Sequence, residues 1–161
     1  MKTNEIVTQN FTTHLLRDFW VTIPADWQSK VISDRSRYFI GPNVGSSHVT
    51  LLVYSALKSE TDTRTYKNFY DKHMASVQHK KNFRLERESS LKSSGFKAKG
   101  QYCNYVFYEE KIDTEVRIQC IFSEGPEQLI MLNYYIPLLK NAEEHIKMSE
   151  KILNSFRLKQ E

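Results

Sequence analysis

The sequence has few of the residues that bind metals or form disulfide frameworks, and it has no long apolar run. Its 161 residues include two cysteines, five glycines and four prolines. Cys103 and Cys120 give neither the spacing of a zinc site nor a disulfide scaffold. No stretch reaches the ~18–20 apolar residues of a membrane-spanning helix. We therefore expect a protein that needs no metal and is not embedded in a membrane.

The N-terminal region lacks the apolar segment and the small-residue cleavage site of a signal peptide. We expect residues 1–12 to be a flexible segment or a peripheral strand, and residues 13–161 to form a single domain. Without an export signal we expect a cytoplasmic protein. There the two cysteines would be small buried hydrophobic residues, whereas an oxidising compartment could join them.

Sequence motifs of catalysis are also missing. The chain has no G-x-S-x-G, no G-x-G-x-x-G and no H-E-x-x-H, and its five histidines have no paired metal-ligand spacing. Glu109 and Glu110 are adjacent, so on a strand they would point to opposite faces and could not act as a catalytic pair. Catalytic triads assemble in space, so missing motifs disfavour an enzyme without deciding the matter. We expect no enzymatic activity and no cofactor.

The net charge of +4 is modest, and the positive residues are scattered apart from one cluster at residues 79–87, HKKNFRLER. A basic cluster can bind nucleic acid or an acidic membrane surface. No nucleic-acid-binding motif accompanies this one. We interpret it as the solvated end of a helix followed by an exposed strand, and we expect no nucleic-acid partner.

The spacing of apolar residues predicts the order of strands and helices. We expect one helix from Asp62 to about Lys80, and a second from Asn141 with Phe156 near its end. Asp62 is a suitable N-cap, and Asn141 with Glu144 fits a capping box. Around the first helix the sequence predicts five strands, with a hairpin loop at 41–47: His14–Ile23, Gln28–Ser33, Arg37–Ile40, His48–Ala56 and Phe83–Ser93.

Three further strands follow in a row, at Lys97–Tyr108, Glu115–Ser123 and Gln128–Ile136. All three are rich in β-branched and aromatic residues. The first link, 109–114, is short, and the second contains Gly125-Pro126, which favours a turn. Short links make neighbouring strands antiparallel. The sequence therefore predicts an α+β domain, with a mainly antiparallel sheet whose long C-terminal hairpin strands are packed by two helices.

Each of these strands has two faces, because side chains alternate across a strand. If each link is roughly symmetric about its middle, one face is almost wholly apolar and should pack on helices: Cys103, Tyr105, Phe107, Val116, Ile118, Cys120, Phe122, Ile130, Leu132, Tyr134 and Ile136. The opposite face, here called the mixed face, combines apolar groups with amides and one arginine: Tyr102, Asn104, Val106, Tyr108, Arg117, Gln119, Ile121, Leu129, Met131, Asn133 and Tyr135.

The composition of the mixed face has two interpretations. A plain solvent face would carry mostly Lys, Glu, Ser and Thr. An apolar surface with a few placed polar groups is typical of a binding site. A second layer of helices, or a dimer partner, would equally well cover such a face.

Four segments resemble the DcrB-related proteins, which have the PsbP-like fold. FWVTIPADWQ, at Phe19–Gln28, is similar to their opening strand and I-P-x-x-W motif. Gly95–Ala98, Val116–Phe122 and a C-terminal helix ending in Ser155-Phe156 follow in the order of the family. The resemblance covers nearly the whole chain. Because many relatives are exported lipoproteins and this chain lacks their signal and lipid-bearing cysteine, it looks more like the cytoplasmic Eag chaperones of bacterial type VI secretion.

The resemblance implies an ATP-independent chaperone or adaptor that forms a homodimer. Such proteins shield the N-terminal transmembrane helices of a type VI secretion effector on a concave apolar surface. The family's glutamine on the second long hairpin strand corresponds to Gln119, and a second glutamine position falls near His73. We therefore expect the client to contact these residues: Gln119, Asn104, Val106, Ile121, Met131, Asn133, Tyr102, Tyr108, Arg117 and His73.

Two other functions remain open at this point. A PsbP-like module could bind a folded protein or a small ligand without chaperone activity. A structural or envelope-stress protein, like the exported relatives, is disfavoured by the missing signal. A wide apolar groove in a dimer would favour the chaperone, whereas a closed pocket in a monomer would favour the generic module.

Overall fold

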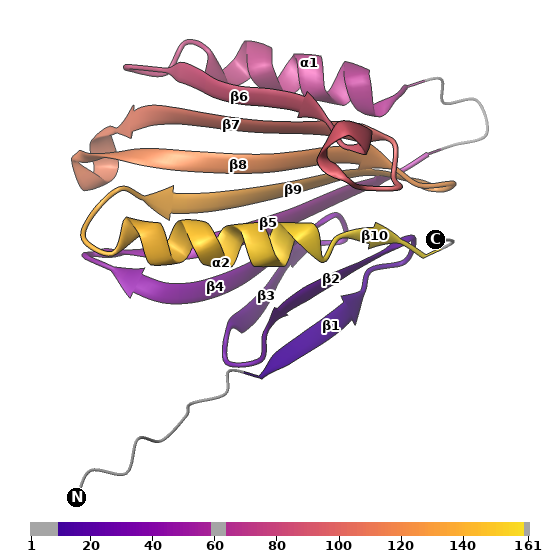
Figure 1. Ribbon diagram of the computed structural model, residues 1–161, viewed down its shortest axis with the longest axis horizontal. Helices are drawn as coiled ribbons and strands as arrows, with labels where there is room; N and C mark the ends of the chain where they lie inside the picture. The colour runs from indigo at the N-terminus through magenta and orange to yellow at the C-terminus, as the bar shows by residue number, and fades with distance from the viewer. Residues whose placement is uncertain (1–9, 59–63, 160–161) are drawn as a thin grey trace, which may run out of the picture.

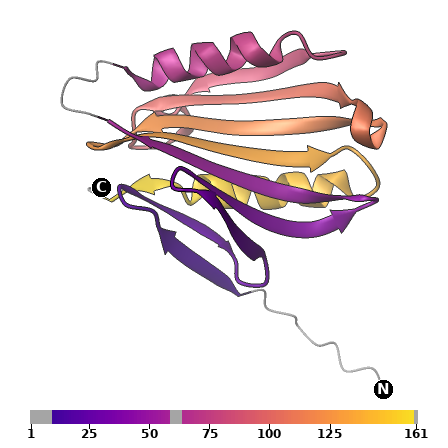
Figure 2. The ribbon, with the colours of Figure 1, turned by 180° about the vertical axis from the view of Figure 1, so that it is seen from behind.

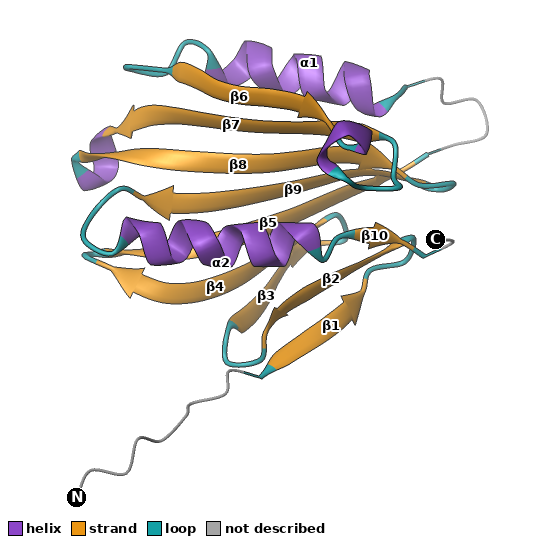
Figure 3. Cartoon of the chain, viewed as in Figure 1, coloured by secondary structure: helices purple, strands orange, loops and turns teal. Residues whose placement is uncertain are grey.

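The computed structural model describes residues 10–58 and 64–159, which form an α+β fold with two antiparallel sheets (Figure 1 and Figure 3). The main sheet has seven strands, in the order β3 (Gln28–Ser33), β4 (Ser36–Val44), β5 (Ser47–Leu57), β9 (Gln128–Pro137), β8 (Thr114–Glu124), β7 (Gly100–Glu109) and β6 (Arg84–Ser90). The small sheet has the order β1 (Phe11–Leu15), β2 (Phe19–Pro24) and β10 (Arg157–Leu158).

The predicted fold class is confirmed, and most predicted strands lie within a few residues of their observed bounds. The exception is the opening strand, which was expected at His14–Ile23 and is divided into β1 and β2. The chain reverses at Arg17, whose φ of 67° is left-handed, and the backbone N–H of Leu16 donates to the carbonyl oxygen of Phe19. The apolar pattern runs through this reversal without a glycine or proline to mark it.

Gly41-Pro42 was expected to end a strand, but β4 continues through both residues to Val44. The pairing with β5 is irregular between Ile40 and Asn43, which accommodates the proline. The indole ring of Trp27 lies against Gly41, where a Cβ atom would come within 2.6 Å of the ring. The expected loop at 41–47 therefore shrinks to a tight turn at Gly45-Ser46, where Gly45 has a φ of 61°.

Helix α1 (Tyr66–Val77) begins at Thr65, which forms a reciprocal capping box with Asn68. The predicted N-cap, Asp62, lies outside the described residues. Helix α2 (Ala142–Asn154) begins after Asn141, but the expected capping box with Glu144 is wrong. Asn141 has a φ of 71°, and its side chain makes no capping hydrogen bond. Two single 3₁₀ turns, at Lys92–Ser94 and Glu110–Ile112, complete the described helices.

The two helices pack on opposite faces of the main sheet (Figure 1 and Figure 2). They also cover different strands. Helix α1 contacts β7 and β8, whereas α2 contacts β9 and β2. Each helix therefore closes its own apolar core. Tyr105, Cys120 and Phe122 belong to the core under α1, while Leu132 and Ile136 belong to the core under α2.

The register between strands corrects one part of the predicted face pattern. Between β7 and β8 the prediction is confirmed, since Cys103 lies opposite Cys120. Between β8 and β9, Phe122 pairs with Met131, so β9 is shifted by one residue from the predicted alignment. Such a shift exchanges the two faces of a strand. The assignment of four residues to the face of Phe122 is wrong, and they face α2 instead: Ile130, Leu132, Tyr134 and Ile136.

Candidate functional site

The predicted client-binding residues do not form one surface. Those of β7 and β8 face the side of α2, and this group contains Tyr102, Asn104, Val106, Tyr108, Arg117, Gln119 and Ile121. The other three lie on the side of α1: His73, Met131 and Asn133. The residues that were predicted to share the mixed face therefore lie on both sides of the sheet, because β9 is shifted by one residue from its predicted alignment.

Gln119 is a buried contact between β8 and α2 rather than an open surface residue. Its side chain is 2% exposed, its Oε1 accepts a hydrogen bond from the hydroxyl of Ser149, and its Nε2 donates to the Tyr102 hydroxyl at 3.3 Å. Asn104, Val106 and Ile121 are also buried. A client helix could not reach Gln119 without displacing the α2 side chains around it.

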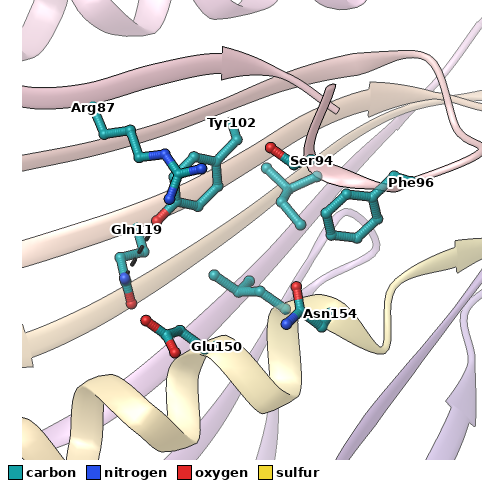
Figure 4. A pocket seen from close by; sticks show the side chains of 9 residues that line it. Arg87, Ser94, Phe96, Tyr102, Gln119, Glu150 and Asn154 are labelled. Atoms are coloured by element: carbon teal, nitrogen blue, oxygen red, sulfur yellow. Dashed lines mark hydrogen bonds between the residues drawn. The ribbon is translucent and has the colours of Figure 1, made fainter. Parts of the chain in front are cut away.

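A polar cleft of about 310 Å³ opens beside this contact, between α2 and the strands β6 to β8 (Figure 4). Arg87 lies over the ring of Tyr102 on one wall, and Glu150 and Asn154 project from α2 on the other. Phe96, Ile121 and Leu153 supply the apolar groups of its lining. The cleft is too polar to shield an apolar helix.

Ion pairs occupy the rest of this side of the sheet. Arg117 pairs with Glu86 at 2.9 Å, and Arg84 pairs with both Glu86 and Glu115. The hydroxyl of Tyr108 donates to the Asp113 carboxylate. Arg84 and Glu115 are the more exposed of these residues, whereas Arg117 is largely buried beside Glu86. Their charges partner one another and leave no apolar surface for a client on this part of the sheet.

The apolar open surface lies on the opposite side, beside α1. Helix α1 reaches part of β9, but no helix of the described residues covers β5 and β4 there, and these strands are in plain view in Figure 2. Two adjoining hollows, of about 400 and 280 Å³, lie between these strands and α1. We name this region the α1 groove. Its floor and wall combine apolar and aromatic residues with three polar ones, Thr50, His73 and Asn133. The full set is Tyr38, Thr50, Leu52, Tyr54, Phe69, His73, Phe107, Leu129, Met131, Asn133 and Tyr135.

The floor of the α1 groove follows from the strand register. Tyr54 lies opposite Met131, Leu52 opposite Asn133, and Tyr38 opposite Leu52. Side chains of paired residues point to the same face of a sheet, so these residues form continuous rows across β4, β5 and β9. The exposure of Tyr38, Leu52 and Tyr54 is intermediate. The floor is therefore an aromatic and aliphatic surface that is partly open to solvent, with Leu129 and Met131 buried at its base.

The wall of the groove is one face of α1. Phe69 packs on Tyr54, with ring centroids 5.6 Å apart, and edge-on against Phe122 at 5.5 Å. His73, one turn later, packs on Phe122 at 5.2 Å. The four-residue spacing of Phe69 and His73 places both on the face of the helix that looks toward the sheet.

His73 lines both hollows and is the polar group at their junction. Its Nε2 lies 2.8 Å from the hydroxyl of Tyr105. Burial disfavours the charged imidazolium and lowers the pKa of His73 to about 4. The imidazole is consequently neutral near pH 7, and burial likewise raises the pKa of Tyr105. The groove therefore has an uncharged centre.

Sequence reasoning found three residues of this groove and missed the strands that form half of it. His73, Met131 and Asn133 were predicted. Tyr38, Leu52 and Tyr54 were not, because they belong to strands far from the three C-terminal strands in the sequence. Alternation within HVTLLVYSA separates Thr50, Leu52 and Tyr54 from the more buried Val49, Leu51 and Val53, and this signal could have identified them.

The described residues contain no group of three or more side chains that could hold a metal ion. In the same part of the chain, neither helix has the length and apolar character needed to cross a membrane. The chemistry available in the α1 groove is therefore apolar contact, with hydrogen bonding at Thr50, His73 and Asn133.

Comparison with known proteins identifies the fold. No family model matches the chain, and neither does any curated protein. Cyanobacterial PsbP (CyanoP) from Synechocystis sp. PCC 6803 has a similar structure, with a TM-score of 0.62 and 11% identity over 98% of each chain. The Ran-binding protein Mog1p of Saccharomyces cerevisiae gives 0.60 and 8%, over 94% of this chain and 96% of its own. LpqN of Mycobacterium tuberculosis, involved in cell envelope biogenesis, gives 0.58 and 11%, over 94% and 90%.

The fold is PsbP-like, as the sequence predicted. Identities this low show the fold alone, so the assignment to DcrB-related proteins and to the Eag branch stays a prediction. The same holds for the expected absence of enzymatic activity. Neighbours of such different descriptions share a scaffold, and function has to be argued from the site.

Proposed function

We propose that this protein is an ATP-independent binding protein that holds apolar helices of a partner protein in the α1 groove. The resemblance to Eag chaperones favours a partner with N-terminal transmembrane helices, such as a type VI secretion effector, bound in the cytoplasm by a homodimer. The observation that carries the proposal is the uncovered aromatic floor on β4, β5 and β9 beside α1.

The size and composition of the groove support a helix as its occupant. An apolar helix in water needs its side chains buried, and each large side chain fully buried contributes about 1.5–3 kcal/mol. Phe69, Tyr54 and Met131 offer apolar contact in one hollow, and Leu52 and Tyr135 offer it in the next. Met131 adds a side chain that adapts to different partners. Asn133 and Thr50 can accept or donate hydrogen bonds to small polar groups on the helix.

The proposal relocates the client from Gln119 to the α1 groove. Gln119 stabilises the packing of α2, so its replacement would disturb the fold before it disturbed binding. Among the residues predicted from the sequence, the proposal retains Met131, Asn133 and His73 as contacts. It adds Tyr38, Leu52 and Tyr54.

The decisive experiment measures binding of a labelled apolar helical peptide by fluorescence anisotropy. Leu52→Glu places a charge on the groove floor, and we expect affinity to fall at least tenfold. Leu52→Gln should give a smaller loss and serves as a second variant if the charge impairs folding. Leu15→Glu, at an apolar side chain 43% exposed on β1, makes the same charge change outside the groove and should bind normally. Equal binding by all variants would refute the proposed site.

Co-expression with an effector's N-terminal segment tests the chaperone role in the same site. We expect a soluble complex whose mass, measured by light scattering, contains two copies of this 19.0 kDa chain. Leu52→Glu should leave the segment insoluble, whereas Leu15→Glu should not. A complex that forms equally with Leu52→Glu would place the client elsewhere on the protein.

A second candidate is a binding module for a small apolar ligand. Hollows of about 400 and 280 Å³ are near the lower end of small-molecule pockets. In that case a small aromatic probe would bind and the helical peptide would not. The continuous open floor across three strands favours the longer occupant.

A further inference from the structure

The charged side chains that line the α1 groove, among the described residues, are basic. Arg64 and Lys72 line the larger hollow, and Lys80 lines the smaller one. No aspartate or glutamate of the described residues lines either hollow. Burial and, after it, the charge of nearby Glu109 raise the pKa of Tyr135, so one carboxylate lies close to the groove without lining it.

The cations follow the wall along its length. Asn68, Lys72 and Ser76 recur every four residues and line the larger hollow, so they form the solvent edge of the groove-facing side of α1. Lys80 continues this line beyond the helix end, with its Nζ 4.7 Å from the centroid of the Phe107 ring. Asp71 is the acidic residue of α1 and does not line the groove.

Two of these cations, Lys72 and Lys80, are available to a partner. Within residues 10–58 and 64–159, neither Lys72 nor Lys80 forms an ion pair with a carboxylate. On the far margin, Lys30 of edge strand β3 pairs in register with Tyr38 and therefore points to the groove side of the sheet. Positive side chains consequently flank the apolar floor on both margins.

We infer that the α1 groove selects helices whose apolar face is bordered by acidic side chains. This inference rests on the proposed function and specifies the partner of the same site. The apolar face would lie on Tyr54, Leu52 and Met131, while flanking carboxylates would reach Lys72 and Lys80. Lys80 lies over the Phe107 ring, which partly shields its pair from water, whereas the pair with the exposed Lys72 is solvated and weaker. Selection against basic flanks follows from repulsion at the same positions.

The test uses three helical peptides with one apolar face and with flanking positions filled by glutamate, glutamine or lysine. We expect the glutamate peptide to bind the full-length protein about tenfold more tightly than the lysine peptide at low salt. Raising the ionic strength should shrink this difference, since salt screens the charges. The double variant Lys72→Glu, Lys80→Glu should reverse the order of the two charged peptides and leave the glutamine peptide unchanged.

Lys67→Glu provides the matched control, because Lys67 is exposed on α1 and does not line the groove. It should keep the preference for the glutamate peptide. Equal binding of all three peptides would overturn the inference and leave the proposed function standing. Failure of all three to bind would overturn both. Dodecanoate is included as a fourth probe, and binding of this carboxylate amphiphile without any peptide would assign the groove to lipids and overturn the inference.

Discussion

The hydroxyl of Ser149 on α2 and the side-chain amide of Gln119 on β8 are joined by a hydrogen bond inside the protein. Ser149 is 0% exposed and Gln119 is 2% exposed. The amide extends the contact to the Tyr102 hydroxyl. Buried polar groups without partners are costly, so this chain of hydrogen bonds favours one position of α2 on the sheet over neighbouring ones.

Gln119→Met should lower the free energy of unfolding by about 1–3 kcal/mol, because it removes both amide hydrogen bonds while keeping the side-chain volume. Urea denaturation measures the change. The Ser149 hydroxyl can still donate to the carbonyl oxygen of Ile146 in this variant. Adding Ser149→Ala should therefore cost less than it does in the unaltered protein, and strictly additive effects would show that the two residues act independently.

Stability should fall as the pH is lowered from about 6.5 to 4. The pKa of His73 is about 4 in the folded protein and 6.5 when the side chain is solvated. Between these values the unfolded state binds the proton and the folded state does not, so protonation favours unfolding. The effect is bounded at about 3 kcal/mol, since one pKa unit corresponds to about 1.4 kcal/mol, and residual solvation of the ring reduces it.

Thermal unfolding as a function of pH measures this dependence, and His73→Gln isolates the contribution of one residue. Burial and the nearby Arg37 also lower the pKa of His14, which acts in the same direction. The variant should therefore flatten the decline without abolishing it. A decline of unchanged slope would mean that His73 titrates normally in the folded protein.

Gly100→Ala should destabilise the protein by roughly 1–3 kcal/mol or more, as forced overpacking does. A Cβ atom at Gly100 would lie 2.1 Å from the carbonyl oxygen of Phe122 and 2.6 Å from the Leu91 side chain. The backbone of β8 cannot move away without breaking the pairing with β7. Chemical denaturation of this variant is best compared with Lys99→Ala, at the exposed preceding residue, which should unfold almost normally.

The two cysteines should resist thiol reagents in the folded protein. Both are 0% exposed and free, and burial is the main cause that raises the pKa of the Cys120 thiol. Thiolate is the reactive species, so reaction should require unfolding. Labelling should accelerate in parallel with loss of structure in urea. Ser46→Cys, in an exposed turn, is a positive control that should react at once, and rapid reaction of the unaltered protein would contradict the buried arrangement.

Much of the fold was predictable because local signals agreed with the final structure. The alternation of Cys103, Tyr105 and Phe107 predicted the core face of β7, and the short link to β8 gave the correct register. The division of the first strand at Arg17 was missed because a non-glycine residue adopts the left-handed conformation there. The apolar pattern on either side of Arg17 is equally compatible with one strand.

The site was harder to predict because it depends on register and coverage. A turn that pairs Glu124 with Leu129 fixes which side of the sheet receives Met131, and that pairing is not encoded in the composition of either strand. Gln119 and Met131 have similar surroundings in the sequence and both are buried, yet Gln119 contacts α2 while Met131 lies at the base of the α1 groove on the other side of the sheet. Each helix covers only part of one face of the main sheet, and which part it covers depends on the tertiary packing of the whole chain.

Strand β2 lies between the first and the last strands of the described chain. Trp20 pairs with Arg157, and the backbone N–H of Thr22 donates to the Ser155 hydroxyl at 2.8 Å. Contacts between residues so distant in sequence form slowly, because most of the intervening chain must be ordered first. During synthesis, β2 emerges early and must wait for residues 157 and 158 to leave the ribosome. Until then, the apolar side of the β1–β2 hairpin remains available to the cell's folding chaperones.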